Sequence, residues 1–177
     1  MIRIGFKLIK LKSLGENVRL GGSCQLCNTQ NLIVGDDVLI GDGCYINANS
    51  LIKIGNGCML GPKVFCFAGS HNYDSKDLRA VPFDNRLLDL PIVIENNVWI
   101  GGNVSIAPGT KIGEGSVISM GCTVAGTIPP YSVVIGSKGI VAKTRDIQKY
   151  KQLVSDNQIY GKKYVNHPFE IVPRESE

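Results

Sequence analysis

Aliphatic residues recur every six positions in the second half of this chain, and that period restricts the fold more than any other feature. The uninterrupted series is Ile94, Ile100, Ile106, Ile112, Ile118 and Val124. This period matches neither an α-helix nor an alternating hairpin strand. It is typical of short flat strands that follow one another around a triangular parallel β-helix, each strand contributing one inward aliphatic side chain.

Earlier segments carry the same hexad. They are Val34, Ile40 and Ile46, then Ile54, Leu60 and Cys66 after a two-residue slip, and more weakly Leu14, Leu20, Leu26 and Leu32. Tight corners are expected at Asp36-Asp37, Asn56-Gly57, Asn96-Asn97 and Pro108-Gly109. Three hexads predict a coil of about 18 residues, stacked on the next coil at the inter-strand spacing of ~4.8 Å.

Composition supports this all-β prediction and excludes several other classes. The 177 residues include 36 Ile or Val and 21 Gly but only six Ala, which argues against a helical bundle. The net charge of +4 is mild and comes without a Lys/Arg-rich run, so we expect no nucleic-acid partner; a small anionic ligand would explain it as well. We find neither an uninterrupted signal-like apolar region nor a transmembrane segment, and expect a cytoplasmic protein.

The repeat also divides the chain. Residues 1–13 are expected to cap the first coil, and residues 14–143 to form the β-helix domain with an excursion loop over 72–91. Residues 144–177 form a C-terminal tail. A short helix over 145–154 in this tail is expected to cap the last coil.

The register assigns most of the six cysteines to the core. Cys24, Cys44, Cys58 and Cys122 fall at the small fifth position of the hexad and Cys66 at the aliphatic first position, as expected for buried thiols. Cys24 and Cys27 form the one C-x-x-C pair, which leaves a metal or redox role open. A zinc site would need two further ligands, and the sequence shows none at matching spacing.

His71 stands where the repeat stops. The loop that follows it is polar, and a loop of about twenty residues inside a compact domain is usually functional or disordered. His71 is therefore a candidate general base, against the alternative of a surface histidine. The only other histidine, His167, is expected to be structural or exposed in the tail.

Three segments give the chain a family resemblance. They are Gly69-Ser70-His71, PIVIENNVWIGG at 91–102 and IPPYSVV at 128–134. Together they resemble the hexapeptide-repeat O-acetyltransferases that act on sugars and on bacterial capsule or O-antigen polysaccharide. The resemblance covers about residues 30–145. It implies a left-handed parallel β-helix, a homotrimer with active sites between subunits, acetyl-CoA as co-substrate without a metal, and His71 as the base.

Site residues follow from the same resemblance. Tyr45 and Asn47 match the family's acceptor-binding Tyr-x-Asn, and Asp74 and Asn85 are further acceptor candidates in the loop. Trp99 matches the family tryptophan beside the thioester. The backbone N–H of Gly102 matches the family N–H that faces the thioester carbonyl. Positions that line the family's CoA groove are Met120, Ala125 and Gly126, although the family often has Thr-Lys in place of the last two. The basic ending of the family reads GSKGIVAK at 136–143, which leaves Lys138 and Lys143 as the expected phosphate contacts.

The predicted reaction is direct acetyl transfer in a ternary complex to a hydroxyl of a sugar or a surface-polysaccharide precursor. His71 would take the hydroxyl proton and Gly102 would stabilise the oxyanion. An N-acetyltransferase acting on a xenobiotic or an amino sugar is the alternative within the same class, and a non-catalytic β-helix scaffold is the alternative of another class. A zinc hydratase on this fold would require three histidines per metal ion, which the chain lacks.

Overall fold

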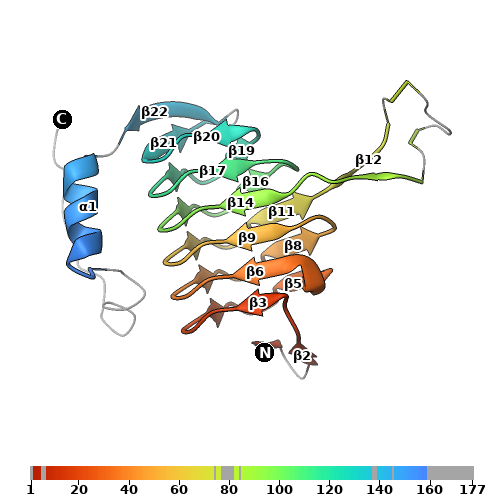
Figure 1. The fold of residues 1–177 in the computed structure, drawn as a ribbon, viewed down its shortest axis with the longest axis horizontal. Coiled ribbons are helices and arrows are strands. Elements are labelled where there is room, and N and C mark those ends of the chain that lie inside the picture. The colour runs from red at the N-terminus through yellow and green to blue at the C-terminus, as the bar shows by residue number, and fades with distance from the viewer. Residues whose placement is uncertain are drawn as a thin grey trace.

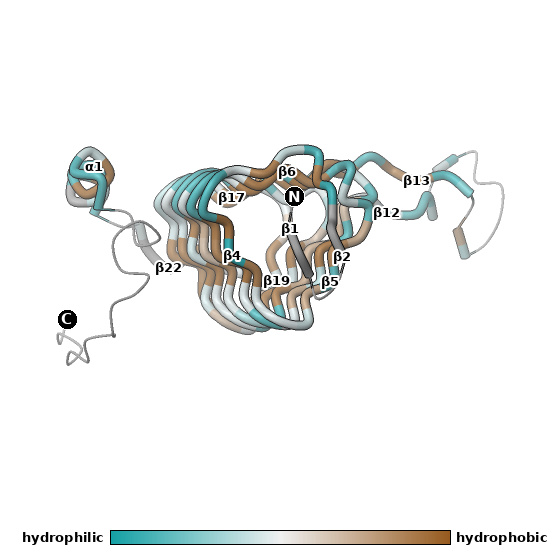
Figure 2. Tube along the Cα trace, turned by 90° about the horizontal axis from the view of Figure 1, so that it is seen from below, coloured by the Kyte–Doolittle hydropathy of each residue, from teal (hydrophilic) through white to brown (hydrophobic). Residues whose placement is uncertain are grey.

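A computed structural model describes residues 2–4, 7–73, 75–76, 82–83, 85–136, 139–144 and 146–158. In it the chain winds into a stack of coils with an arm on one side and a helix on the other (Figure 1). Seen along the stack, the coils superpose on one outline (Figure 2). The parallel β-helix predicted from the hexads is confirmed.

Three parallel sheets form the faces of this stack. Face 1 contains β3 (Ser13–Leu14), β6 (Leu32–Val34), β9 (Ile52–Ile54), β14 (Ile92–Ile94), β17 (Lys111–Ile112) and β20 (Thr127–Ile128). Face 2 contains β4 (Arg19–Leu20), β7 (Leu39–Ile40), β10 (Met59–Leu60), β15 (Trp99–Ile100), β18 (Val117–Ile118) and β21 (Ser132–Ile135). Face 3 contains β5 (Gln25–Cys27), β8 (Tyr45–Ala48), β11 (Phe65–Ala68), β16 (Ser105–Ile106) and β19 (Thr123–Val124). We call the turns from face 1 to 2, from 2 to 3 and from 3 to 1 corners 1, 2 and 3.

The core is a set of ladders of like side chains. On face 2, Ile40, Leu60, Ile100 and Ile118 pair in register from coil to coil, and each is at most 1% exposed. The predicted corners are also observed, because Asp37, Gly57, Asn97 and Gly109 take the left-handed φ of 56–77° that a tight turn requires. Hexad position therefore decides which residues are buried.

The uniform coil of 18 residues is wrong for most of the stack. Val34 pairs with Ile54, and Ile54 with Ile94, whereas Ile94 pairs with Ile112 and Ile112 with Ile128. The early coils are two residues longer because corner 3 there is a wider turn, which in the first coil contains the 3-10 helix η1 (Thr29–Asn31). The coil between Ile54 and Ile94 is longer still because it contains the arm.

The two ends of the stack are covered differently. At the N-terminal end, β1 (Ile2–Ile4) and β2 (Lys7–Ile9) form an antiparallel hairpin. At the other end, β22 (Ile140–Thr144) pairs antiparallel with β21 and covers the edge of the last coil on face 2. The predicted helix is present as α1 (Ile147–Ser155), but it lies beside the coils instead of capping the last one (Figure 1).

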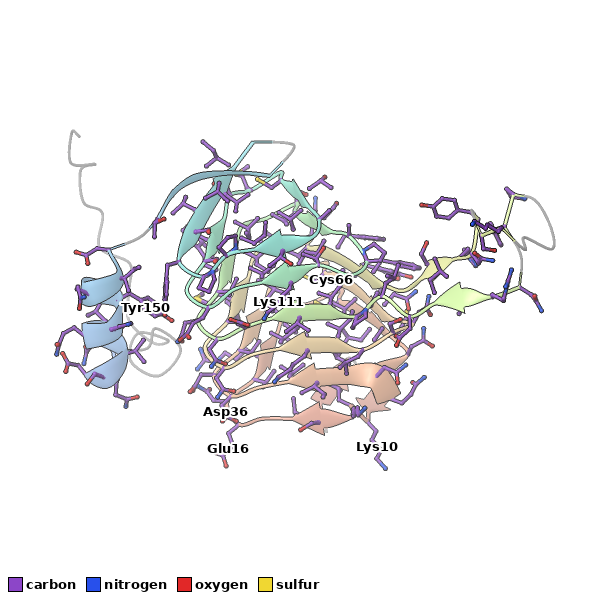
Figure 3. The ribbon with its side chains drawn as sticks, turned by 45° about the horizontal axis from the view of Figure 1, so that its top comes forward. Lys10, Glu16, Asp36, Cys66, Lys111 and Tyr150 are labelled. Atoms are coloured by element: carbon purple, nitrogen blue, oxygen red, sulfur yellow. The ribbon has the colours of Figure 1, made fainter. Side chains whose placement is uncertain are left out.

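One buried tyrosine attaches α1 to corner 1. Tyr150 is 8% exposed; its hydroxyl accepts a hydrogen bond from Asn97 Nδ2 at 3.0 Å and donates one to Glu114 Oε1 at 3.1 Å (Figure 3). Its ring also packs edge-on against Tyr131. The helix is held along the side of the stack because this contact lies on the corner and not at the end.

The cysteine prediction is confirmed for the five hexad positions. All five of these thiols are buried and free, while Cys27 is half-buried. Within the described residues, no group of three or more His, Cys, Asp or Glu side chains could hold a metal ion. Likewise, no helix in that part of the chain is long and apolar enough to cross a membrane.

Candidate active site

His71 lies on the arm that leaves the stack at corner 3. The arm begins with β12 (Ser70–His71), which pairs antiparallel with β13 (Leu87–Leu88), so His71 stands opposite Leu87. Figure 1 shows this ladder extending away from the coils. The imidazole is exposed, and it lies outside the aliphatic core.

Hydrogen bonds fix the root of the arm. The amide of Gly69 donates to Leu90 O at 3.0 Å, and the Leu90 amide donates to the buried Ser50 Oγ at 3.0 Å. Gly69 has a φ of 83°, and a Cβ there would come 3.1 Å from Ser50 Oγ. Only glycine fits this crossing comfortably, so the sequence Gly69-Ser70-His71 sets the direction in which the arm leaves.

Further along the arm, Ser75 joins its two sides. Its hydroxyl oxygen accepts from Asn72 Nδ2 at 2.9 Å and from Arg86 Nη2 at 3.1 Å, and the Asn72 amide donates to Arg86 O. Asn72 is only 4% exposed. The residue next to His71 is therefore anchored.

Acceptor candidates Tyr45 and Asn47 lie on the outer side of face 3. Asn47 Oδ1 accepts from Asn28 Nδ2 at 2.8 Å, and Asn47 Nδ2 donates to Tyr45 Oη at 3.4 Å. Asn28 Nδ2 also donates to Asn49 Oδ1. This amide network holds the Asn47 side chain in one orientation, near the corner from which the arm leaves.

An aromatic row accompanies these polar residues. The Tyr45 ring stacks on Phe65 with centroids 4.8 Å apart, and Phe65 stacks on Phe67 at 6.3 Å. Phe65 remains 44% exposed even so. Face 3 thus presents a row of aromatic rings on its outer surface, which the hexad pattern did not predict. The sequence signal for this row is the 20-residue separation of Tyr45 and Phe65, which equals the true length of this coil.

Gly102 lies at corner 2 and has a free backbone donor. In the first coil, the equivalent Gly22 N–H donates to the carboxylate of Asp42 in the next coil. The residue above Gly102 is Met120, which offers no such acceptor, and no acceptor for the Gly102 N–H exists among the described residues. A polar donor at the surface without a partner suits an incoming carbonyl oxygen.

Two apolar side chains flank this donor. Trp99 on β15 is 57% exposed and Met120 is 74% exposed, whereas most large apolar side chains of the stack are buried. The expected cofactor residues Ala125 and Gly126 are also exposed, but they lie at corner 3, beyond β19. A single chain therefore does not bring all the predicted cofactor residues together.

The same separation applies to the two residues expected to catalyse. Gly102 lies beside Pro62, before β11 begins, and His71 follows the end of β11. At about 3.3 Å per strand residue, the two are on the order of 15–20 Å apart. In the described chain the two residues therefore lie at opposite ends of β11 and not against one another.

Several predicted site residues are not placed. Asp74 and Lys138 lie outside the described residues, and only the backbone of Lys143 is described, on β22. Asn85 is exposed on the arm. Phe83, which no motif indicated, packs against His71 with ring centroids 3.9 Å apart.

Comparisons with known proteins agree with this architecture. A family model for the bacterial transferase hexapeptide (six repeats) matches residues 91–126. The Escherichia coli (strain K12) protein WbbJ, named for lipopolysaccharide biosynthesis O-acetyl transfer, is 30% identical over 138 residues, which cover 74% of this chain and 70% of WbbJ. The chain belongs to the hexapeptide-repeat acetyltransferases.

Solved members of this acetyltransferase family share its fold. A maltose O-acetyltransferase from Clostridium difficile 630 superposes with a TM-score of 0.70 at 31% identity, covering 77% of this chain and 71% of its own. A Vibrio cholerae hexapeptide-repeat acetyltransferase, solved with acetyl coenzyme A, gives 0.68 at 28% identity over 76% and 71% of the two chains. The present chain spans between 38% and 62% of the length of three further acetyltransferase relatives.

Proposed function

We propose that the chain transfers the acetyl group of acetyl-CoA to a hydroxyl of a sugar or of a surface-polysaccharide precursor. The observation that carries this proposal is the pair of half-sites: an exposed histidine on an anchored arm, and a free backbone N–H between exposed Trp99 and Met120. Two relatives are named for maltose O-acetyl transfer and for O-acetyl transfer in lipopolysaccharide biosynthesis, and a third acetyltransferase is solved with acetyl coenzyme A.

The two half-sites meet if three copies assemble around one axis. Corner 3 of each copy, with His71, would then face corner 2 of the next, with Gly102. Face 3 joins these corners, so this arrangement turns it toward the axis. That position would cover the exposed Phe65 and the aromatic row, which supports the trimer on grounds independent of the catalytic residues.

The chemistry balances without a covalent enzyme intermediate. The His71 imidazole removes the proton of the acceptor hydroxyl while its oxygen attacks the thioester carbon. The Gly102 N–H of the neighbouring copy stabilises the oxyanion, and the C–S bond then breaks. CoA thiolate leaves and recovers the proton from the imidazolium, so the products are the acetyl ester and CoA.

A direct assay tests the proposal. The protein is incubated with acetyl-CoA and soluble mono- and oligosaccharides, with one amino sugar included, and the products are analysed by mass spectrometry. We expect an O-acetylated sugar, and His71→Ala should lower kcat by roughly 10²- to 10⁴-fold while the protein stays folded. Transfer only to the amine would establish the N-acetyl alternative. An alanine variant within about three-fold of the native kcat would overturn the role of His71.

A further inference from the structure

The net positive charge of the chain equals the charge of its N-terminal segment. Residues 1–12 contain Arg3, Lys7, Lys10 and Lys12 and no acidic residue. The chain has 19 Lys and Arg against 15 Asp and Glu, so the residues after Lys12 carry fifteen of each sign. The whole excess of +4 thus belongs to the N-terminal segment, while the rest of the chain is neutral.

The described part of this segment shows where the charges lie. Leu11 is 8% exposed and anchors the chain in the first coil, while Lys10 and Lys12 on either side of it are exposed. Figure 3 shows Lys10 pointing away from the coils at this end. Neither lysine has an ion-pair partner in the described part of the chain. Glu16 and Arg19 of the first coil are both exposed and cancel one another in charge.

A hollow opens between the two lysines and the first wide turn of corner 3. It has a volume of about 440 Å³ and is lined by Lys10, Leu11, Lys12, Thr29 and Gln30. Thr29 Oγ1 donates to Lys10 O at 2.9 Å, and the Lys12 amide donates to Thr29 O at 3.0 Å. These bonds hold the lysine backbone against the turn. Lys10, Lys12 and Gln30 supply ammonium and amide N–H donors around this hollow, and such donors suit a phosphate group.

Apolar residues alternate with these cations. Seven of the first twelve residues are apolar, and the β1–β2 hairpin pairs Ile2 with Ile9 and Arg3 with Leu8. Nucleic-acid sites are typically larger clusters of Lys and Arg on one face of a domain with a pI above about 9. This segment has only four cations, and the pI of the chain is about 8.7. Cations mixed with aliphatic residues are typical of segments that lie in the headgroup region of an anionic bilayer.

We infer that the N-terminal end of the β-helix is a docking surface for an anionic phospholipid membrane. The hollow between the lysines takes a lipid phosphate, and the hairpin lies against the headgroups. A threefold axis keeps equivalent ends at one level, so the proposed trimer would present three such surfaces together and strengthen the attachment. That strengthening alone rests on the proposed trimer; the surface itself is a property of one chain.

Vesicle co-sedimentation tests this surface. The full chain is mixed with vesicles of phosphatidylcholine containing about 30 mol% phosphatidylglycerol, and with vesicles of phosphatidylcholine alone. We expect binding to the anionic vesicles only, with loss of most binding between ~50 and ~300 mM NaCl. Equal binding to both vesicles, or none to either, would overturn the inference.

Charge variants locate the surface. Lys10→Gln with Lys12→Gln should weaken vesicle binding by at least roughly five-fold. Lys53→Gln with Lys151→Gln removes the same charge from exposed positions elsewhere and should bind as the native protein does. If both pairs weaken binding equally, the attraction is general and the assigned surface is wrong. Tighter binding to heparin or RNA than to anionic vesicles would also overturn the membrane assignment.

Melting temperature and solution acetyl transfer are measured for both pairs. We expect neither to change, because none of the four lysines lies in the proposed catalytic site. Loss of vesicle binding with intact transfer separates this inference from the proposed function. If the native protein binds vesicles but has no transferase activity, the proposed function is wrong and the membrane-docking surface still stands.

Discussion

The imidazole ring of His71 lies almost flat against the phenyl ring of Phe83, with centroids 3.9 Å and planes 14° apart. Phe83 belongs to the returning side of the arm, so the contact joins two segments that meet only because β12 pairs with β13. Phe83 is 43% exposed and therefore covers one face of the imidazole while its own outer face stays open. A stacked neighbour of this kind would restrict rotation of the histidine ring, so we propose Phe83 as a positioning residue for the proposed base.

Replacing Phe83 by Leu should lower kcat about three- to ten-fold, because an aromatic pair contributes about 0.5–1.5 kcal/mol beyond its buried area. The KM for acetyl-CoA should stay unchanged, since Phe83 lies on the acceptor side of the proposed site. Phe83→Tyr keeps the stack and should restore the native kcat and pH–rate profile. A leucine variant with native kcat would show that the stack does not position the base.

The buried thiols should be chemically silent in the folded protein. Burial raises the pKa of Cys66 to about 12 and the pKa values of Cys44 and Cys58 to about 11, so little thiolate exists at neutral pH. Only Cys27 is half-buried. We expect a thiol-specific chromogenic reagent at about pH 8 to modify one cysteine quickly and the other five only after unfolding. Rapid reaction of two or more thiols in the native state would contradict this prediction. So would a folded Cys27→Ser variant in which one thiol still reacts quickly.

The attachment of α1 should contribute to stability through Tyr150. Burial raises the pKa of its phenol, so the group stays neutral and keeps donating to Glu114. Tyr150→Phe should lower the free energy of unfolding by about 1 kcal/mol through the lost hydrogen bonds. Tyr150→Ala should lower it by about 3 kcal/mol because the packing is lost as well. Urea unfolding measures both, and an alanine variant as stable as the native chain would show that the helix is not held there.

The hexad predicted the fold because it encodes one simple physical requirement. Every sixth residue must enter the core, so Ile100 and Ile118 could be placed without knowing what they contact. Coil length could not be read in the same way. The wide turn that ends in Ser50 adds no aliphatic residue to the hexad, and only the pairing between coils reveals the two extra residues.

The site was predictable only where a motif carries it. Local sequence predicts roles for His71 and Gly102, but their separation across face 3 is a property of the wound chain. Phe83 could not be found, because its contact depends on how the arm folds back and not on any spacing. Phe65 was missed for a related reason: its stack with Tyr45 follows from a coil of 20 residues, and the sequence favoured 18.

The phosphate contacts of the cofactor give a further prediction. Lys138 and Lys143 remain the expected partners, since the family's first basic position is Ile140 here. Truncating either lysine to Ala should raise the KM for acetyl-CoA several-fold, more at high salt, with little change in kcat. Dephospho-acetyl-CoA should be insensitive to the same substitution. If both thioesters respond alike, the lysine does not contact the 3′-phosphate.

The proposed shared site makes the most specific prediction, because its two halves would come from different copies. His71→Ala removes the base at corner 3, and Gly102→Val places a branched side chain where the thioester carbonyl would sit. Each variant alone should be inactive. When equal amounts are unfolded, mixed and refolded together, about one quarter of the sites should combine a native His71 with a native Gly102. Mixing should therefore restore about a quarter of the native activity.

Gly22→Val is the matched control for the glycine change. Gly22 holds the same corner position in the first coil, and a Cβ there meets only Asp42 Oδ1 at 3.7 Å, so this variant should be active by itself. A Cβ at Gly102 comes 3.2 Å from Pro62 O, which calls for a melting curve to show that Gly102→Val still folds. If the two variants fold and assemble together but stay inactive after mixing, His71 and Gly102 do not act together across subunits. If either single variant has native activity, the residue that it replaces does not belong to the site.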